Sequence, residues 1–133
     1  MELIAWNDSL ATGISIIDAQ HKVLINKLNK LNSSIKALND SELNILLDEL
    51  LEYTFYHFET EENYFEEFDY EGKEAHLKEH DEFRKYLRTF LKTEVRNDSN
   101  TQNELLNFLK KWVEHHIKDI DMMYVDSLKE KIK

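Results

Sequence analysis

The chain has 133 residues, a length that suits one domain with one core. Its formal net charge of -10, from 27 acidic and 17 basic side chains, would repel phosphate backbones and anionic membrane surfaces. We therefore expect no nucleic-acid partner. The complete lack of cysteine excludes disulfides, iron–sulfur clusters and thiolate zinc sites, so any metal must bind to nitrogen and oxygen ligands.

The sequence shows no pattern of export or membrane insertion. Its start lacks a basic segment followed by an apolar run, and nowhere do about 18 apolar residues stand together. We expect a cytoplasmic protein without a membrane span. Proline is absent and glycine occurs only at Gly13 and Gly72, a composition that favours helices throughout.

The first half of the chain predicts an arm and two helices. Residues 1–17 are apolar without regular spacing, which predicts an extended arm packed on the domain. Asp18 is the expected N-cap of a helix over 18–38, because apolar side chains then recur at intervals of three and four. A short polar connection separates it from a second helix over 41–68 with the same spacing.

The second half predicts two more helices. A break before Gly72 precedes a helix over 72–95, and Thr101 with Glu104 has the spacing of a capping box that would begin a helix over 101–120. A helical tail over 122–132 follows. Long amphipathic helices with short connections predict an all-α fold, an up-down-up-down antiparallel four-helix bundle forming a single domain over 1–133.

Five of the six histidines and two carboxylates fall on the apolar stripes of these helices. In the predicted bundle all seven lie at one end, where their side chains can meet in one layer of the core. Burying so many polar groups without partners would be costly, and a bound metal resolves that cost. The candidate ligands are His21, His57, Glu61, His76, His80, His116 and Asp121.

The spacing within each pair supports convergence in two cases and raises a question in the third. His57 with Glu61, and His76 with His80, are four residues apart and point the same way along a helix. His116 and Asp121 are five apart, which separates them by about 140° on a regular helix. We therefore predict a π-bulge or a break between them.

The number and type of donors indicate the metal. Seven ligands exceed the four of a tetrahedral zinc site, and carboxylates can bridge two ions. Imidazole and carboxylate donors in the core of a bundle suit a pair of iron ions. The expected cofactor is thus a non-haem di-iron centre.

The chain resembles the hemerythrins, in particular their single-domain bacterial members. The similarity covers roughly residues 6–124 and rests on five motifs, namely Gly13-Ile14 leading to Ile17 through His21, His57 through Glu62, His76 with His80, Trp112 with His116-Ile117, and Asp121. This resemblance implies reversible dioxygen binding for oxygen transport, storage or delivery, without catalysis.

The resemblance also implies how the ligands divide. One iron (Fe2+/Fe3+) would be held by His76, His80 and His116, and the other by His21 and His57. Glu61 and Asp121 would bridge the two together with an oxo or hydroxo group, leaving the second iron an open position for dioxygen. His116 fits the family pattern better than its neighbour His115, which we expect at the surface or outside the ligand set.

Four further residues are expected around the site. Phe58, Trp112 and Ile117 are core residues, of which Phe58 and Trp112 also wall the centre. The family commonly has leucine after the helical tryptophan, whereas this chain has Val113. A smaller side chain there leaves room for water or ligand, so we expect faster autoxidation than with leucine.

Several alternatives remain open from the sequence. His76 through His80 matches H-x-x-E-H, the inverted zinc-peptidase motif with Glu79 as general base. A ferritin-like di-iron oxidase would need two Glu-x-x-His pairs, which the chain lacks. Sensing of oxygen, redox state or nitric oxide at the same di-iron site is another alternative, as is a purely structural bundle. We expect a monomer that serves an unknown oxygen-consuming client.

Overall fold

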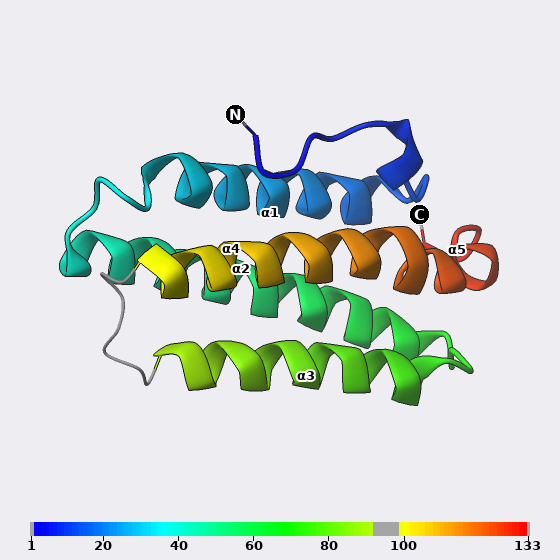
Figure 1. The fold of residues 1–133 in the computed structure, drawn as a ribbon. Coiled ribbons are helices and arrows are strands. Elements are labelled where there is room, and N and C mark those ends of the chain that lie inside the picture. Colours follow the sequence, from blue (N-terminus) through cyan, green and yellow to red (C-terminus); the bar gives the residue numbers. More distant parts are fainter. Residues whose placement is uncertain (1, 92–98, 133) are drawn as a thin grey trace.

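The computed structural model describes residues 2–91 and 99–132, and every regular element within these ranges is helical (Figure 1). Helices α1 to α4 run antiparallel in chain order, so the predicted all-α, up-down-up-down four-helix bundle is confirmed. The elements are the 3-10 helix η1 (Asp8–Leu10), α1 (Ser15–Ser34), α2 (Asp40–Glu67), α3 (Lys73–Leu91), α4 (Ser99–His115), the π-helix η2 (His116–Ile120) and α5 (Met122–Leu128).

Helix α1 begins and ends earlier than the sequence predicts. Its first residue is Ser15, because Ile14 and Ile17 are both buried and continue the apolar stripe toward the N-terminus. Asp18 is therefore inside the helix and is not its N-cap. Its carboxylate instead accepts hydrogen bonds from the backbone N–H and hydroxyl of Thr12, both at 2.8 Å, and from the N–H of Gly13 at 3.1 Å.

Helix α2 matches its predicted range closely and has the capping box that we expected elsewhere. Asn39 accepts a hydrogen bond from the N–H of Glu42 at 2.9 Å, and the Glu42 side chain accepts one from the N–H of Asn39 at 3.0 Å. The predicted break follows at Asp69, which adopts the left-handed conformation with a φ of 50°. Helix α3 then begins at Lys73.

The boundaries of α4 and of the tail also differ from the prediction. Helix α4 begins at Ser99, so Thr101 lies within its first turn and is not the N-cap. The predicted third helix extended to residue 95, and its segment 92–95 lies outside the described residues. The tail is helical only over Met122–Leu128, followed by a turn.

The apolar core is divided into two clusters by a polar layer. The main cluster runs along the bundle and includes Phe58 and Ile117, whereas a smaller one closes the end where α5 lies and consists of Ile14, Ile17, Phe65, Tyr124 and Leu128. On α2, Phe58 of the main cluster directly follows His57, and Phe65 of the smaller cluster lies four residues after Glu61. The candidate ligands therefore lie between two apolar clusters.

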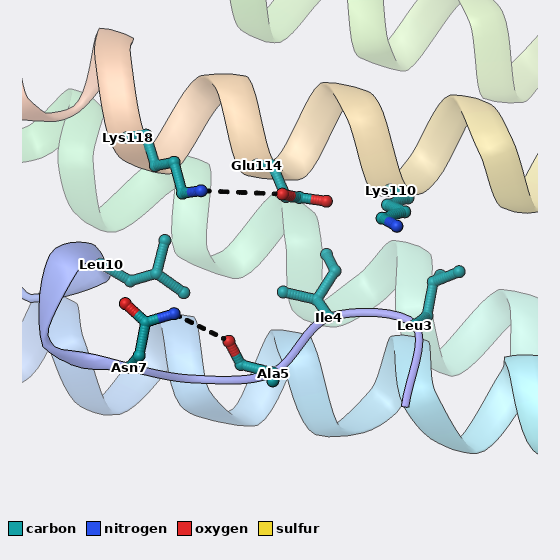
Figure 2. A pocket seen from close by; sticks show the side chains of 8 residues that line it. All are labelled: Leu3, Ile4, Ala5, Asn7, Leu10, Lys110, Glu114 and Lys118. Carbon is teal, nitrogen blue, oxygen red and sulfur yellow. Dashed lines mark hydrogen bonds and ion pairs between the residues drawn. The ribbon is translucent and has the colours of Figure 1, made fainter. Parts of the chain in front are cut away.

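The residues before α1 form a covering arm, partly as predicted. The side chain of Asn29 accepts hydrogen bonds from the N–H groups of Leu3 at 2.7 Å and Ile4 at 3.0 Å, which fastens the arm to α1. Figure 2 shows a surface pocket that is lined on one side by the arm and on the other by the side chains of Lys110, Glu114 and Lys118. The arm is interrupted by η1, which packs on the π-helix η2.

None of the helices built from residues 2–91 and 99–132 combines the length and apolarity needed to cross a membrane.

Candidate metal centre

The structure brings all seven predicted ligands together at one end of the bundle. They come from the start of α1, the end of α2, the start of α3 and the π-helix η2 with the residue after it. Each is at most 3% exposed. The layer is therefore sealed from solvent, and its members are His21, His57, Glu61, His76, His80, His116 and Asp121.

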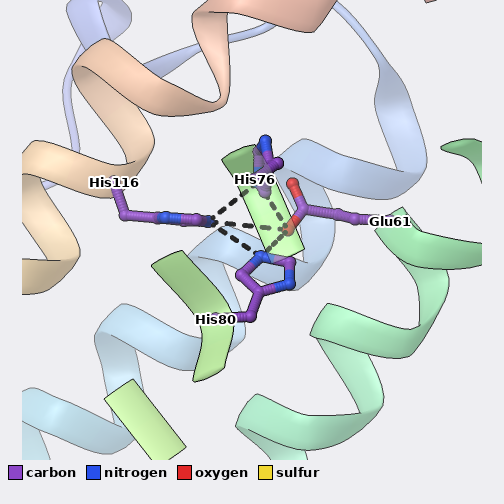
Figure 3. Close-up of side chains that lie close together, drawn as sticks. All are labelled: Glu61, His76, His80 and His116. Carbon is purple, nitrogen blue, oxygen red and sulfur yellow. Dashed lines mark hydrogen bonds and ion pairs between the residues drawn. The ribbon is translucent and has the colours of Figure 1, made fainter. Parts of the chain in front are cut away.

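A first group of donors surrounds one oxygen of Glu61 (Figure 3). Its Oε1 atom lies 3.2 Å from Nε2 of His80, 3.7 Å from Nε2 of His116 and 3.8 Å from Nε2 of His76. The Nε2 atom of His116 is also 3.2 Å from that of His80 and 3.3 Å from that of His76. Three imidazoles and a carboxylate thus point at one small volume.

A second group shares Glu61 with the first and adds His21, His57 and Asp121. The Nε2 atoms of His21 and His57 are 3.1 Å apart, and Nε2 of His21 lies 2.9 Å from Oδ2 of Asp121. The other oxygen of Asp121, Oδ1, is 2.9 Å from Nε2 of His116 in the first group. Both carboxylates therefore lie between the two sets of histidines.

The π-helix makes this convergence possible. The N–H of Asp121 donates to the carbonyl of His116 at 2.7 Å, a bond that spans five residues and confirms the predicted irregularity. The wider turn brings two side chains five residues apart onto one face. His115 instead points outward, with a side chain 56% exposed and a contact of 2.8 Å to Asp119.

The outer nitrogen of His57 is held by an amide. Nδ1 of His57 lies 2.7 Å from Oε1 of Gln20, whose amide group donates to the hydroxyl of Thr60 at 3.1 Å. The amide orientation is fixed by this network, so the carbonyl oxygen faces His57 and Nδ1 must donate. In the neutral ring Nε2 then carries the lone pair, directed into the layer.

The outer nitrogen of His80 is held by a carboxylate. Nδ1 of His80 lies 2.7 Å from Oε2 of Glu62, and Arg84 donates to the same oxygen at 3.1 Å. Partial burial would raise the pKa of Glu62, but His80 and Arg84 outweigh it and hold that pKa below its usual value. Glu62 is therefore an ionised acceptor for Nδ1 of His80, which leaves Nε2 directed into the layer.

The layer holds two carboxylates among imidazoles, and several of their buried polar atoms lack a hydrogen-bond partner among the described residues. Burial lowers the pKa of His57 to about 4, so this ring is neutral near pH 7 and its lone pair faces His21. Within the described part of the chain, Oε1 of Glu61 and both oxygens of Asp121 are buried without a well-aligned hydrogen-bond donor. Unpartnered anionic oxygens beside imidazole lone pairs are the donor set that a cation requires.

The protonation of the remaining groups supports the same conclusion. Burial disfavours charge on His116, but Asp121 and Glu61 outweigh burial and raise the pKa of His116 to about 10. Burial likewise opposes ionisation of Glu61, yet the surrounding imidazoles hold its pKa well below the usual value. Without metal, the two carboxylates therefore attract protons onto histidines, where bound cations would replace them.

Aromatic side chains close the layer. The ring of Phe58 stacks on His80 with a centroid distance of 3.8 Å, and that of Trp112 stacks on His116 at 4.5 Å. Val113 and Ile117 are buried in the same apolar cluster as Phe58. Phe58 and Trp112 thus contact two of the candidate ligands, and Val113 and Ile117 belong to the core beside them.

The residues that hold the ligands from behind were not predicted from the sequence. Gln20, Glu62, Arg84 and Tyr124 were not singled out as contacts of the ligands. The hydroxyl of Tyr124 donates to Oε2 of Glu61 at 2.7 Å. Two of these residues could have been suspected from their positions next to candidate ligands, because Gln20 directly precedes His21 and Glu62 directly follows Glu61.

Comparisons with known proteins agree with this geometry. Residues 12–128 match the family described as hemerythrin HHE cation binding domain. A bacteriohemerythrin of Stenotrophomonas maltophilia is 32% identical over 129 residues, which span 97% of this chain and 84% of the relative. A bacteriohemerythrin of Clostridium acetobutylicum is 30% identical over 129 residues, which span 93% of this chain and the whole of the relative.

Solved structures show the same arrangement of helices. A crystal structure of wild-type hemerythrin superposes with a TM-score of 0.79 at 27% identity, covering 92% of this chain and 95% of the other. A leucine-to-alanine variant of hemerythrin gives a TM-score of 0.82 at 29% identity, covering 96% and 98%. The chain therefore belongs to the hemerythrin family.

Proposed function

We propose that this protein binds dioxygen reversibly at a pair of iron ions, for oxygen transport, storage or delivery. The observation that carries the proposal is the division of one buried layer into two groups of donors that share Glu61, with the other carboxylate, Asp121, placed between them. A single ion cannot use both groups at once, whereas two ions bridged by these carboxylates would use every donor.

The proposed division of ligands leaves the two ions unequal. His76, His80 and His116 would hold one iron, and His21 and His57 the other, with Glu61 and Asp121 bridging them. With an oxo or hydroxo bridge in addition, the first iron would have six donors and the second five. Dioxygen would bind at the second iron, which would have the smaller set of donors.

Iron would supply the electrons that reversible dioxygen binding requires, and the chain would supply a dry, preorganised site. The ligands are nearly inaccessible to solvent, and apolar clusters lie on both sides of the layer. Water and solutes are thereby kept from the reduced ions. Tyr124 fixes one oxygen of Glu61, while Gln20 and Glu62 fix the rings of His57 and His80.

The zinc hydrolase alternative receives no support from the geometry. Its motif requires Glu79 as a general base beside a metal held by His76 and His80. Glu79 belongs to neither group of donors, although it lines a surface pocket that His76 also lines. The carboxylates that do face these histidines are Glu61 and Asp121.

The proposal predicts a reversible optical change at two irons per chain. Metal-free protein reconstituted with ferrous iron under anaerobic conditions should contain two irons. Air should produce charge-transfer bands that vanish when dioxygen is removed, and metal analysis with absorption spectra checks both results. One iron per chain, or bands that never reverse on deoxygenation, would contradict the proposed function.

The tandem histidines provide a matched pair of variants. His116→Ala should lower bound iron to one ion or none per chain and lower the midpoint of thermal unfolding of the iron-treated protein, because a ligand that binds only the folded state stabilises it. His115→Ala removes an exposed ring of the same type and should retain two irons. Metal analysis and calorimetry measure both, and equal iron contents would refute the assignment of His116.

The valine beside the helical tryptophan should affect the lifetime of the oxygenated protein. Val113 is 1% exposed in the main core cluster, and the extra methylene of leucine at this position would add apolar volume beside the site and further exclude water from it. Val113→Leu should therefore autoxidise several times more slowly, as measured by the loss of the oxygenated spectrum over time. An unchanged rate in a variant that still folds and binds two irons would eliminate this role.

A further inference from the structure

We infer that Glu62 is a positioning residue that makes the three-histidine position the tighter of the two metal positions. The inference rests on the proposed two-metal site and adds to it an order of occupancy: one position fills first and empties last. It derives from the contacts behind the histidines, which differ between the two groups. A carboxylate supports His80 in the first group and an amide supports His57 in the second.

The two outer contacts have equal length but different charge. Nδ1 of His80 lies 2.7 Å from the Glu62 carboxylate, and Nδ1 of His57 lies 2.7 Å from the Gln20 carbonyl. A hydrogen bond to an ionised acceptor is about twice as strong as a neutral one. It also makes the opposite ring nitrogen a stronger donor to a metal. His80 is therefore the stronger ligand.

Arg84 fixes both the acceptor and the ring. One guanidinium nitrogen donates to Oε2 of Glu62 at 3.1 Å, and the other donates to Asp81 at 2.8 Å. The guanidinium also lies over the ring of Phe58, 5.2 Å from its centroid. Because Phe58 stacks on His80, the plane of the imidazole and its hydrogen-bond acceptor are held by the same side chain.

The contact behind His57 is fixed but neutral. Gln20 is held in one orientation by Thr60, whose hydroxyl in turn donates to the carbonyl of Tyr56 at 3.1 Å. This network also orients the ring of His57. The Gln20 network carries no negative charge, so His57 is a weaker donor to a metal than His80. The two metal positions also differ in the number of histidines that surround them.

The arrangement permits a test by substitution without opening the core. The side chain of Glu62 is 25% exposed and that of Arg84 19% exposed, so replacing Glu62 leaves no buried cavity. Glu62→Gln keeps the shape and an acceptor oxygen but removes the charge. Glu59→Gln, at an exposed position on the same helix, makes the same change of charge and serves as the control.

The experiment is a titration of metal-free protein with cobalt(II) in competition with a chelator, which requires neither iron nor dioxygen. The parent protein should bind two ions in two resolved steps. Glu62→Gln should weaken the tighter step by about tenfold, the lower end of the loss that follows removal of an outer contact to a metal ligand. The control should match the parent in both steps.

Gln20→Glu supplies the reciprocal measurement and should strengthen the weaker step several-fold, bringing the two steps together. Both steps of Glu62→Gln within about twofold of the parent, or an unchanged weaker step in Gln20→Glu, would overturn the inference while leaving the proposed function intact. A parent protein that binds only one ion would refute the proposed function itself. Circular dichroism of each metal-free variant verifies that it is folded.

Discussion

The constraint on which the structure depends is the burial of two carboxylates among imidazole lone pairs in a layer without solvent. Glu61 and Asp121 are ionised there, and their inward oxygens have no well-aligned donor among the described residues. Such a layer is costly unless positive charge enters it. Protons on His116 offset part of that charge in the metal-free chain, and metal ions would offset it more completely.

The fold confines these buried polar groups to one end of the bundle. Two apolar clusters enclose the polar layer, so the energetic cost is confined to a few residues and offset by burial on either side. The π-helix is a second local cost, and it places His116 and Asp121 on the same face. Irregular backbone therefore occurs where the site needs it, while α1, α2 and α3 remain regular around it.

Much of this arrangement could be predicted from the sequence, because helical spacing and topology constrain the same residues. The five-residue interval between His116 and Asp121 even predicted the irregular turn. Helix ends were less predictable: Asp18 has an N-cap's chemistry but bonds backward to the preceding loop, and only the tertiary structure shows this. The supports Gln20 and Glu62 were also missed, because they contact histidines 37 and 18 residues away and no local pattern marks such contacts.

The central claim is that two metal ions lie side by side in this layer. Anomalous diffraction at the iron absorption edge, from crystals of protein reconstituted with iron, measures this most directly. The account predicts two anomalous peaks about 3.5–4 Å apart, one among the three histidines of the first group and one beside His21 and His57. A single peak, or peaks outside the layer, would contradict it.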